Sequence, residues 1–181
     1  MKRMVAMGAV FLLLLTGCNN EMLNTPTKRV EMFLANYQTL NESVMDDLDK
    51  VVSEEEQFNA DQREIYRSIM KKHYQSITYD IKDEKINGDK ATVRTSITVT
   101  DYSKVMTSAE TYLQEHPEKF QKANKEYDEE KYMDYRLEQM KKAKDTVKYD
   151  MNFHLTKKDK IWKMDPLTEE QEQKIHGVYQ Y

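Results

Sequence analysis

Apolar residues recur at helical spacing from residue 30 to residue 51. They form one stripe of a single predicted helix, and they are Val30, Phe33, Leu34, Tyr37, Leu40, Val44, Leu48 and Val51. Thr25 followed by Pro26 predicts the start of this helix, because threonine caps the first backbone amides and proline suits the first helical position. The polar run at residues 53–56 ends the stripe. A second helix is predicted over residues 59–74, with one side formed by Ile65, Tyr66, Ile69, Met70 and His73.

The spacing then changes to the twofold alternation of β-strands. Residues 77–82 alternate apolar and polar side chains, and Asn87-Gly88 supplies a tight hairpin turn. The return strand alternates most clearly, with one face made of Ala91, Val93, Thr95, Ile97 and Val99. These features predict an antiparallel hairpin with one buried face.

Helical spacing resumes from Lys104 to about Thr146, interrupted at His116-Pro117, because proline disfavours helix in the residue before it. A second strand pair follows, with alternation over residues 147–156 and a return through residues 161–164. A short last helix is predicted between Thr168 as its cap and Gly177.

The element order is therefore helix, helix, hairpin, helical excursion, hairpin, helix. Helices that cover one face of a mainly antiparallel sheet define an α+β fold, and this is the fold class we expect. Charged residues make up 33% of the chain and hydrophobic residues 39%, a balance typical of a compact domain.

The N-terminal segment differs from the rest of the chain. Lys2 and Arg3 precede an apolar run over residues 4–15, which suits the core of a signal peptide and is too short to span a bilayer as a helix. The run ends in Leu15, Thr16, Gly17 and Cys18, which resemble the lipobox of bacterial lipoprotein signal peptides. The resemblance implies that a peptidase recognises residues 15–17 and cuts before Cys18, whose thiol carries a diacylglyceryl group. The alternative is an ordinary secretory signal that contains a cysteine.

We therefore expect a signal peptide at residues 1–17, a lipidated cysteine and tether at residues 18–25, and one domain at residues 26–181. The expected location is the outer face of the plasma membrane, with the membrane bound through the acyl anchor on Cys18. Removing the leader changes the net charge from −4 to −6, because Lys2 and Arg3 are lost. This negative charge argues against nucleic acid as a partner.

The domain itself resembles the small lipoproteins of Gram-positive bacteria that are grouped near the NTF2-like cone fold. The resemblance rests on the element order, on the hairpin over residues 79–99, and on the run over residues 149–155 with Trp162. It implies a curved sheet wrapped around helices and transfers no catalytic residue, because such folds serve enzymes, ligand binders and inert modules alike. The long excursion between the hairpins is larger than this fold usually needs.

No catalytic residues and no cofactor are predicted. Cys18 is the only cysteine, and the four histidines have no spacing typical of a metal site. His73 is expected to be a packed, hydrogen-bonded residue, whereas His116 and His176 are expected to be cations at helix ends. Asp150 and His154 lie four apart on a strand, about 13 Å from each other, and therefore are not partners on a solvated sheet face.

The tyrosines are the remaining candidates for function. Tyr132 and Tyr135 share one face of a helix and are proposed as a contact patch. The preferred interpretation is a non-enzymatic module that contacts an envelope protein or a small ligand. The alternative is an NTF2-like binding or catalytic domain with a pocket between sheet and helices, and its candidate pocket residues are Tyr79, Tyr149, Phe153 and Trp162.

Overall fold

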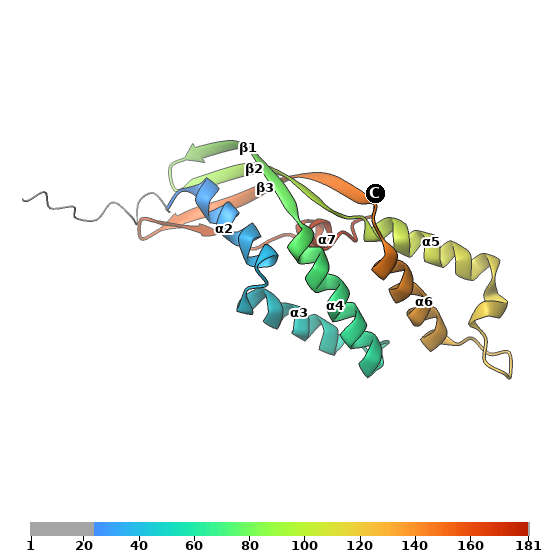
Figure 1. Ribbon diagram of the computed structural model, residues 1–181. Helices are drawn as coiled ribbons and strands as arrows, with labels where there is room; N and C mark the ends of the chain where they lie inside the picture. Colours follow the sequence, from blue (N-terminus) through green and yellow to red (C-terminus); the bar gives the residue numbers. More distant parts are fainter. Residues whose placement is uncertain (1–23, 181) are drawn as a thin grey trace, which may run out of the picture.

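A computed structural model describes residues 24–180 and consists of one antiparallel sheet, six α-helices and one 3-10 helix within that range (Figure 1). The helices are α2 (Pro26–Gln38), α3 (Glu42–Glu54), α4 (Ala60–Ser76), α5 (Tyr102–Glu115), η1 (Pro117–Phe120), α6 (Glu129–Lys142) and α7 (Glu169–His176). The strands are β1 (Thr78–Asn87), β2 (Lys90–Thr100), β3 (Thr146–Lys158) and β4 (Ile161–Met164). The expected α+β fold class is confirmed. The predicted leader, Cys18 and most of the tether lie outside the described residues.

The sheet is an open meander in the order β1-β2-β3-β4. Its two hairpins are the predicted ones, and Gly88 adopts a positive φ of 59° in the first turn. The long central pairing joins β2 to β3 over eleven residue pairs, with Val93 opposite Phe153. The first hairpin therefore forms where Asn87-Gly88 predicted it.

The predicted single helix over residues 30–51 is wrong, because the chain breaks into α2 and α3. Leu40 adopts a left-handed backbone with a φ of 54°. Asn41 then caps α3, because its side chain accepts a hydrogen bond from the Ser43 amide. The apolar spacing continues through the break and hides it, so three helices precede the first hairpin instead of two.

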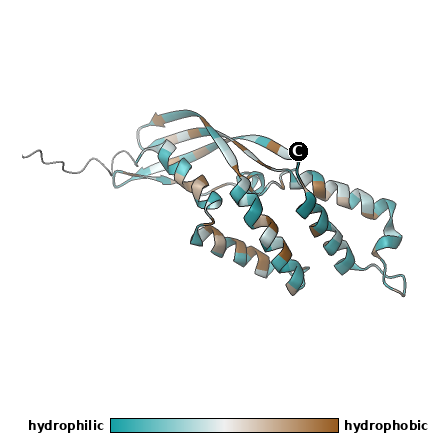
Figure 2. Ribbon diagram, in the orientation of Figure 1, coloured by the Kyte–Doolittle hydropathy of each residue, from teal (hydrophilic) through white to brown (hydrophobic). Residues whose placement is uncertain are grey.

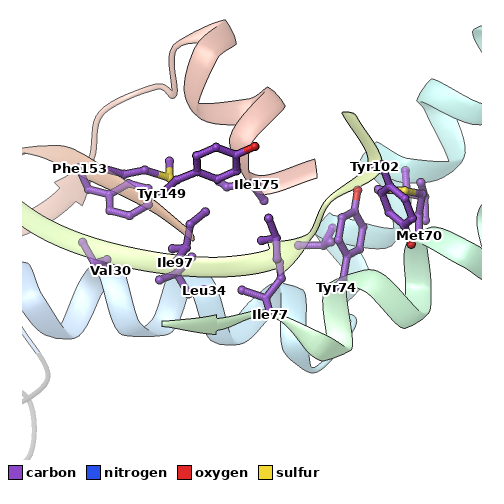
Figure 3. Packing of buried hydrophobic residues seen from close by; sticks show 14 of the residues in the cluster. Val30, Leu34, Met70, Tyr74, Ile77, Ile97, Tyr102, Tyr149, Phe153 and Ile175 are labelled. Atoms are coloured by element: carbon purple, nitrogen blue, oxygen red, sulfur yellow. The ribbon is translucent and has the colours of Figure 1, made fainter. Parts of the chain in front are cut away.

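One face of the sheet packs against α2, α4 and α7 and forms the core (Figure 3). Val30 and Leu34 of α2 are fully buried against this face, as are Ile97 of β2 and Phe153 of β3. Burying one such side chain contributes about 1.5–3 kcal/mol. Figure 2 shows apolar and polar residues alternating along the strands, whereas α6 is mainly hydrophilic. Residues on both sides of the contact between the sheet and α2 are thus fully buried.

The opposite face of the sheet is polar, as the alternation predicted. Arg94 Nη2 lies 2.8 Å from Asp150 Oδ2 across the β2–β3 pair. Thr92 Oγ1 lies 3.2 Å from His154 Nδ1 on the same face. Asp150 and His154 thus have separate partners, which agrees with the expectation that they do not form a pair.

The last helix ends as predicted at Gly177, which has a φ of 70°. A Cβ atom at this position would lie 2.1 Å from the carbonyl oxygen of Thr100. The Gly177 carbonyl in turn accepts hydrogen bonds from the amides of Tyr102 and Ser103, at 2.8 and 3.0 Å. Glycine at position 177 therefore lets the C-terminal turn approach the junction between β2 and α5.

Helices α5 and α6 form an arm that extends from one end of the sheet (Figure 1). The arm has its own small apolar cluster, built around Ala109, Phe120 and Tyr132. Tyr132 is only 6% exposed, and Tyr135 stacks on Tyr112 with ring centroids 4.9 Å apart. Tyr132 of the proposed contact patch is therefore buried inside the arm, whereas Tyr135 is half-buried and lines a cavity between α5 and α6.

The start of the described chain lies at the other end of the sheet from the arm (Figure 1). The Asn24 side chain donates to the Lys160 carbonyl at 2.7 Å and accepts from the Trp162 amide at 3.0 Å. Lys160 lies in the turn between β3 and β4, and Trp162 lies in β4 directly after this turn. The chain therefore enters the domain at the end where the two hairpin turns lie.

Candidate functional site

Helix α4 forms one wall of two grooves and is fastened to α6 by a buried glutamine. Asn59 and Gln62 make a reciprocal capping box at the start of α4. The Gln62 amide group, only 2% exposed, also donates to Asp134 Oδ1 at 2.8 Å and to the Glu130 carbonyl at 3.2 Å. These hydrogen bonds fix the N-terminal part of α4 beside the N-terminal half of α6.

The first groove lies between α4 and α6, and we call it the α4–α6 groove. It has a volume of about 430 Å³. Its apolar lining is provided mainly by Ile65, Ile69 and Met140. Lys72 and Lys141 also line it. Ligand sites in proteins typically have such a volume, a mainly apolar lining and a few polar groups.

His73 is the most deeply buried polar residue of the α4–α6 groove. It is 1% exposed, and its Nε2 lies 2.8 Å from the carbonyl oxygen of Ile175. A carbonyl only accepts hydrogen bonds, so Nε2 carries the proton and Nδ1 is left as an acceptor. Nδ1 is buried and has no hydrogen-bond partner in the described part of the chain.

The environment of His73 keeps its ring neutral. Burial lowers the pKa of His73 from 6.5 to about 4, outweighing the opposite effect of the hydrogen bond to Ile175. The ring lies between Tyr74 and Tyr102, with centroids 5.8 and 5.1 Å away. Burial also raises the pKa of Tyr102 to about 12. These groups of the groove are uncharged near neutral pH.

The second groove lies on the other side of α4, beside α3 and α7, and we call it the α3–α4 groove. It has a volume of about 440 Å³ and is lined by the rings of Tyr37, Tyr66 and Tyr74. Its charged groups are mainly acidic, with Asp47, Glu54 and Glu172 against Lys50. Burial and the nearby carboxylates of Asp47 and Glu172 raise the pKa of Tyr37 to about 12.

His176 lines the α3–α4 groove, and its surroundings differ from those expected for a charged histidine at a helix end. Its Nδ1 lies 3.1 Å from the hydroxyl of Tyr74, and burial lowers its pKa. The prediction of a charged histidine at the end of the last helix is therefore wrong, because α7 packs its C-terminal end against α4. His73 is packed and hydrogen-bonded, as predicted.

The four candidate pocket residues lie away from both grooves. Tyr149, Phe153 and Trp162 are between 0 and 5% exposed and belong to the main core. Tyr79 on β1 is half-buried against the same core. None of the four lines the α4–α6 groove or the α3–α4 groove. The cavities lie between helices, whereas the sequence placed a pocket between sheet and helices.

Two kinds of catalytic centre are relevant to the described residues, a metal cluster and a histidine-based triad. Across residues 24–180 there is no group of three or more histidine, cysteine, aspartate or glutamate side chains placed to hold a metal ion. Neither His73 nor His176 has a hydroxyl nucleophile and an orienting carboxylate arranged around it as a triad.

Sequence reasoning missed the grooves because their walls are far apart in the chain. The signal that was present is the width of the apolar surface of α4. Ile69 and His73 line one groove, Tyr66 lines the other, and Met70 between them is buried in the core. An apolar surface wider than one packing stripe indicates that a helix contacts more than one neighbour.

Comparison with family models, with curated proteins and with solved structures found no match for this chain. Among residues 24–180, no helix has the length and apolar character needed to cross a bilayer.

Proposed function

We propose that the protein is a membrane-anchored extracytoplasmic lipoprotein that acts as a non-catalytic binding module of the cell envelope. In this proposal Cys18 holds the lipid, and the α4–α6 groove is the binding site. The anchor is supported by the lipobox-like residues Leu15 to Cys18 after an apolar run. A diacylglyceryl group makes such an attachment durable, because two acyl chains bind a bilayer far more stably than one.

The proposed anchor also defines an orientation. Cys18 precedes Asn24 by six residues, which span about 20 Å at most when extended. Asn24 is bound at the β3–β4 turn, so the hairpin turns face the membrane in this proposal. The groove adjoins Thr100 at the far end of β2, roughly 33 Å along the strand from Lys90. The binding site would therefore point away from the bilayer.

The observation that carries the binding role is the α4–α6 groove itself. It combines about 430 Å³ of space, an apolar lining and two buried polar rings, those of His73 and Tyr102. A histidine with a pKa of about 4 is a weak base at neutral pH, so it suits hydrogen bonding better than proton abstraction. The mature charge of −6 supports a partner other than nucleic acid.

The second candidate function is that of a ligand-binding or catalytic domain. In this second proposal the domain is related to the NTF2-like cone fold. It is supported by the element order, with an antiparallel sheet covered by helices. The four-stranded sheet is open, and Leu34 of α2 and Phe153 of β3 are fully buried where α2 packs on the sheet. A ligand in such a domain would therefore occupy the α4–α6 groove rather than the sheet interior.

Crosslinking in living cells tests the binding role. A photoreactive amino acid replaces Ile65, which is 40% exposed and lines the groove, or Ile86, which is 54% exposed on β1. We expect a discrete adduct, identified by mass spectrometry, from position 65 and not from position 86. Identical adducts at both positions, or adducts at neither, would contradict a binding site in this groove.

A further inference from the structure

We propose that Nδ1 of His73 is the hydrogen-bond acceptor for the ligand of the α4–α6 groove, and that this ligand is a small, mainly apolar, non-cationic molecule with one O–H or N–H donor. The inference rests on the proposed binding role of the groove and adds the chemistry of recognition. Nδ1 of His73 has no hydrogen-bond partner among the described residues.

Unpartnered polar atoms in a protein interior are uncommon, and each requires an explanation. Four side-chain atoms of this kind occur in the described part of the chain: Arg29 Nε, Arg63 Nε, Thr95 Oγ1 and His73 Nδ1. Both arginines bind other groups through Nη2, and Thr95 lies within the sheet core. Only His73 among them lines the α4–α6 groove. The residue that carries this unpartnered acceptor therefore lines a cavity.

The role of Nδ1 is fixed by the opposite nitrogen. Nε2 donates to the Ile175 carbonyl at 2.8 Å, and burial keeps the ring from gaining a second proton. Nδ1 thus offers a lone pair and accepts a hydrogen bond. The ligand must supply the donor, which excludes ethers, ketones and simple hydrocarbons from full recognition.

The rest of the groove defines the body and the charge of the ligand. Ile65, Ile69 and Met140 provide apolar contacts for a flat or aliphatic body. Lys72 and Lys141 outnumber Glu64 among the charged residues, so an ammonium group is a poor donor here. A volume of about 430 Å³ accommodates a bicyclic molecule. A neutral hydroxyl or N–H compound fits these conditions.

Indole and benzofuran form the matched probe pair, because the two molecules have nearly the same shape and only indole has an N–H donor. The protein is the mature chain, residues 18–181, with Cys18→Ser. Binding is followed by NMR through the methyl groups of Ile69 and Met140 and through the ¹⁵N resonance of His73 Nδ1. We expect indole to shift the methyl and Nδ1 resonances, and benzofuran to bind roughly two- to tenfold more weakly without shifting Nδ1.

A variant provides the second arm. His73→Phe removes the acceptor and keeps a ring, so it should bind both probes with equal affinity; His154→Phe, on the polar face of the sheet, should retain the preference for indole. If His73→Phe does not fold, the Nδ1 resonance of the protein with His73 intact still decides the question.

The outcomes separate the two proposals. Methyl shifts with equal affinities for both probes, or an unchanged Nδ1 resonance on indole binding, overturn the role of His73 and leave the groove as a binding site. The absence of methyl shifts with both probes up to their solubility limits contradicts the groove as a site for apolar ligands, and with it the inference.

Discussion

The Nε2 atom of His73 donates a hydrogen bond to the carbonyl oxygen of Ile175, 2.8 Å away and 102 positions later in the chain. Both residues are almost completely buried. The bond joins α4 to the C-terminal helix α7. The carbonyl of Gly177, which follows α7, accepts hydrogen bonds from the first two amides of α5. One side chain therefore links the C-terminus to the helix that forms both grooves.

We expect His73→Ala to lower the free energy of unfolding by about 2–4 kcal/mol. The substitution leaves the Ile175 carbonyl unpaired and creates a cavity between Tyr74 and Tyr102. Urea unfolding measures the change. His154→Thr is the control, because His154 is exposed on the outer face of β3, and its effect should stay within about 1 kcal/mol. Similar values for both variants would contradict the structural role of His73.

Stability should decrease as the pH falls from 6.5 to 4. The pKa of His73 is about 4 in the folded protein and near 6.5 in the unfolded chain, so the unfolded state binds the proton first. The contribution of His73 is complete above pH 6.5 and diminishes by about 3 kcal/mol over this window. His176 acts in the same direction, because burial also lowers its pKa.

The carboxylates of the protein add their own pH dependence, so His73→Phe is compared with the unsubstituted protein. Urea unfolding at pH 7.5, 6.0, 5.0 and 4.0 should show a smaller loss of stability for the variant. Parallel curves for the two proteins would mean that His73 is not held neutral by the fold.

Two glycines with positive φ form a matched pair. Gly177→Ala should destabilise the protein by more than about 2 kcal/mol, because the new Cβ would lie 2.1 Å from the Thr100 carbonyl oxygen in addition to the strain of a left-handed backbone. A Cβ atom at position 88 would have no other atom within 4 Å. Gly88→Ala should therefore lower the free energy of unfolding only by the backbone strain, about 1–2 kcal/mol. Thermal and urea unfolding compare them, and equal losses would contradict close packing at Gly177.

The arm should unfold locally when its own cluster is weakened. Phe120 packs edge-on against Tyr132 and Tyr135, with centroids 5.4 Å away in both cases. Phe120→Ala should therefore lower the free energy of local opening by about 3–5 kcal/mol in the outer halves of α5 and α6, measured by amide hydrogen exchange. The amides of β2 and β3 should remain protected. Tyr127→Ala, at a residue 50% exposed, is the control. Loss of protection in β2 and β3 would show that the arm and the sheet unfold together.

Local sequence signals predicted much of the fold. Asn87-Gly88 predicted the first hairpin turn, Thr168 and Gly177 predicted both ends of the last helix, and the alternation from Ala91 to Val99 predicted the buried face of β2. These signals succeed because the backbone geometry of a turn, a cap or a strand depends on residues that are adjacent in the chain.

The break at Leu40 and the grooves were not predictable in the same way. Leu40 continues the apolar spacing of the helix, and its left-handed backbone closes the end of α2, where the Asn41 amide donates to the Asn36 carbonyl at 2.9 Å. The α4–α6 groove joins His73 to Met140, which are distant in the chain and belong to no local motif. The sequence placed His176 at an exposed helix end, but packing of α7 against α4 half-buries it beside the Tyr74 hydroxyl.

The proposed lipid attachment at Cys18 is the central claim, because it would place the domain and its groove outside the cytoplasm. Cells expressing the chain with its native leader are fed an alkyne-labelled fatty acid, and the protein is isolated, coupled to a fluorophore and compared with Cys18→Ser. We predict label on the unsubstituted protein in the membrane fraction and none on the variant. Label that persists on Cys18→Ser, or an unsubstituted protein that never carries label, would contradict the account.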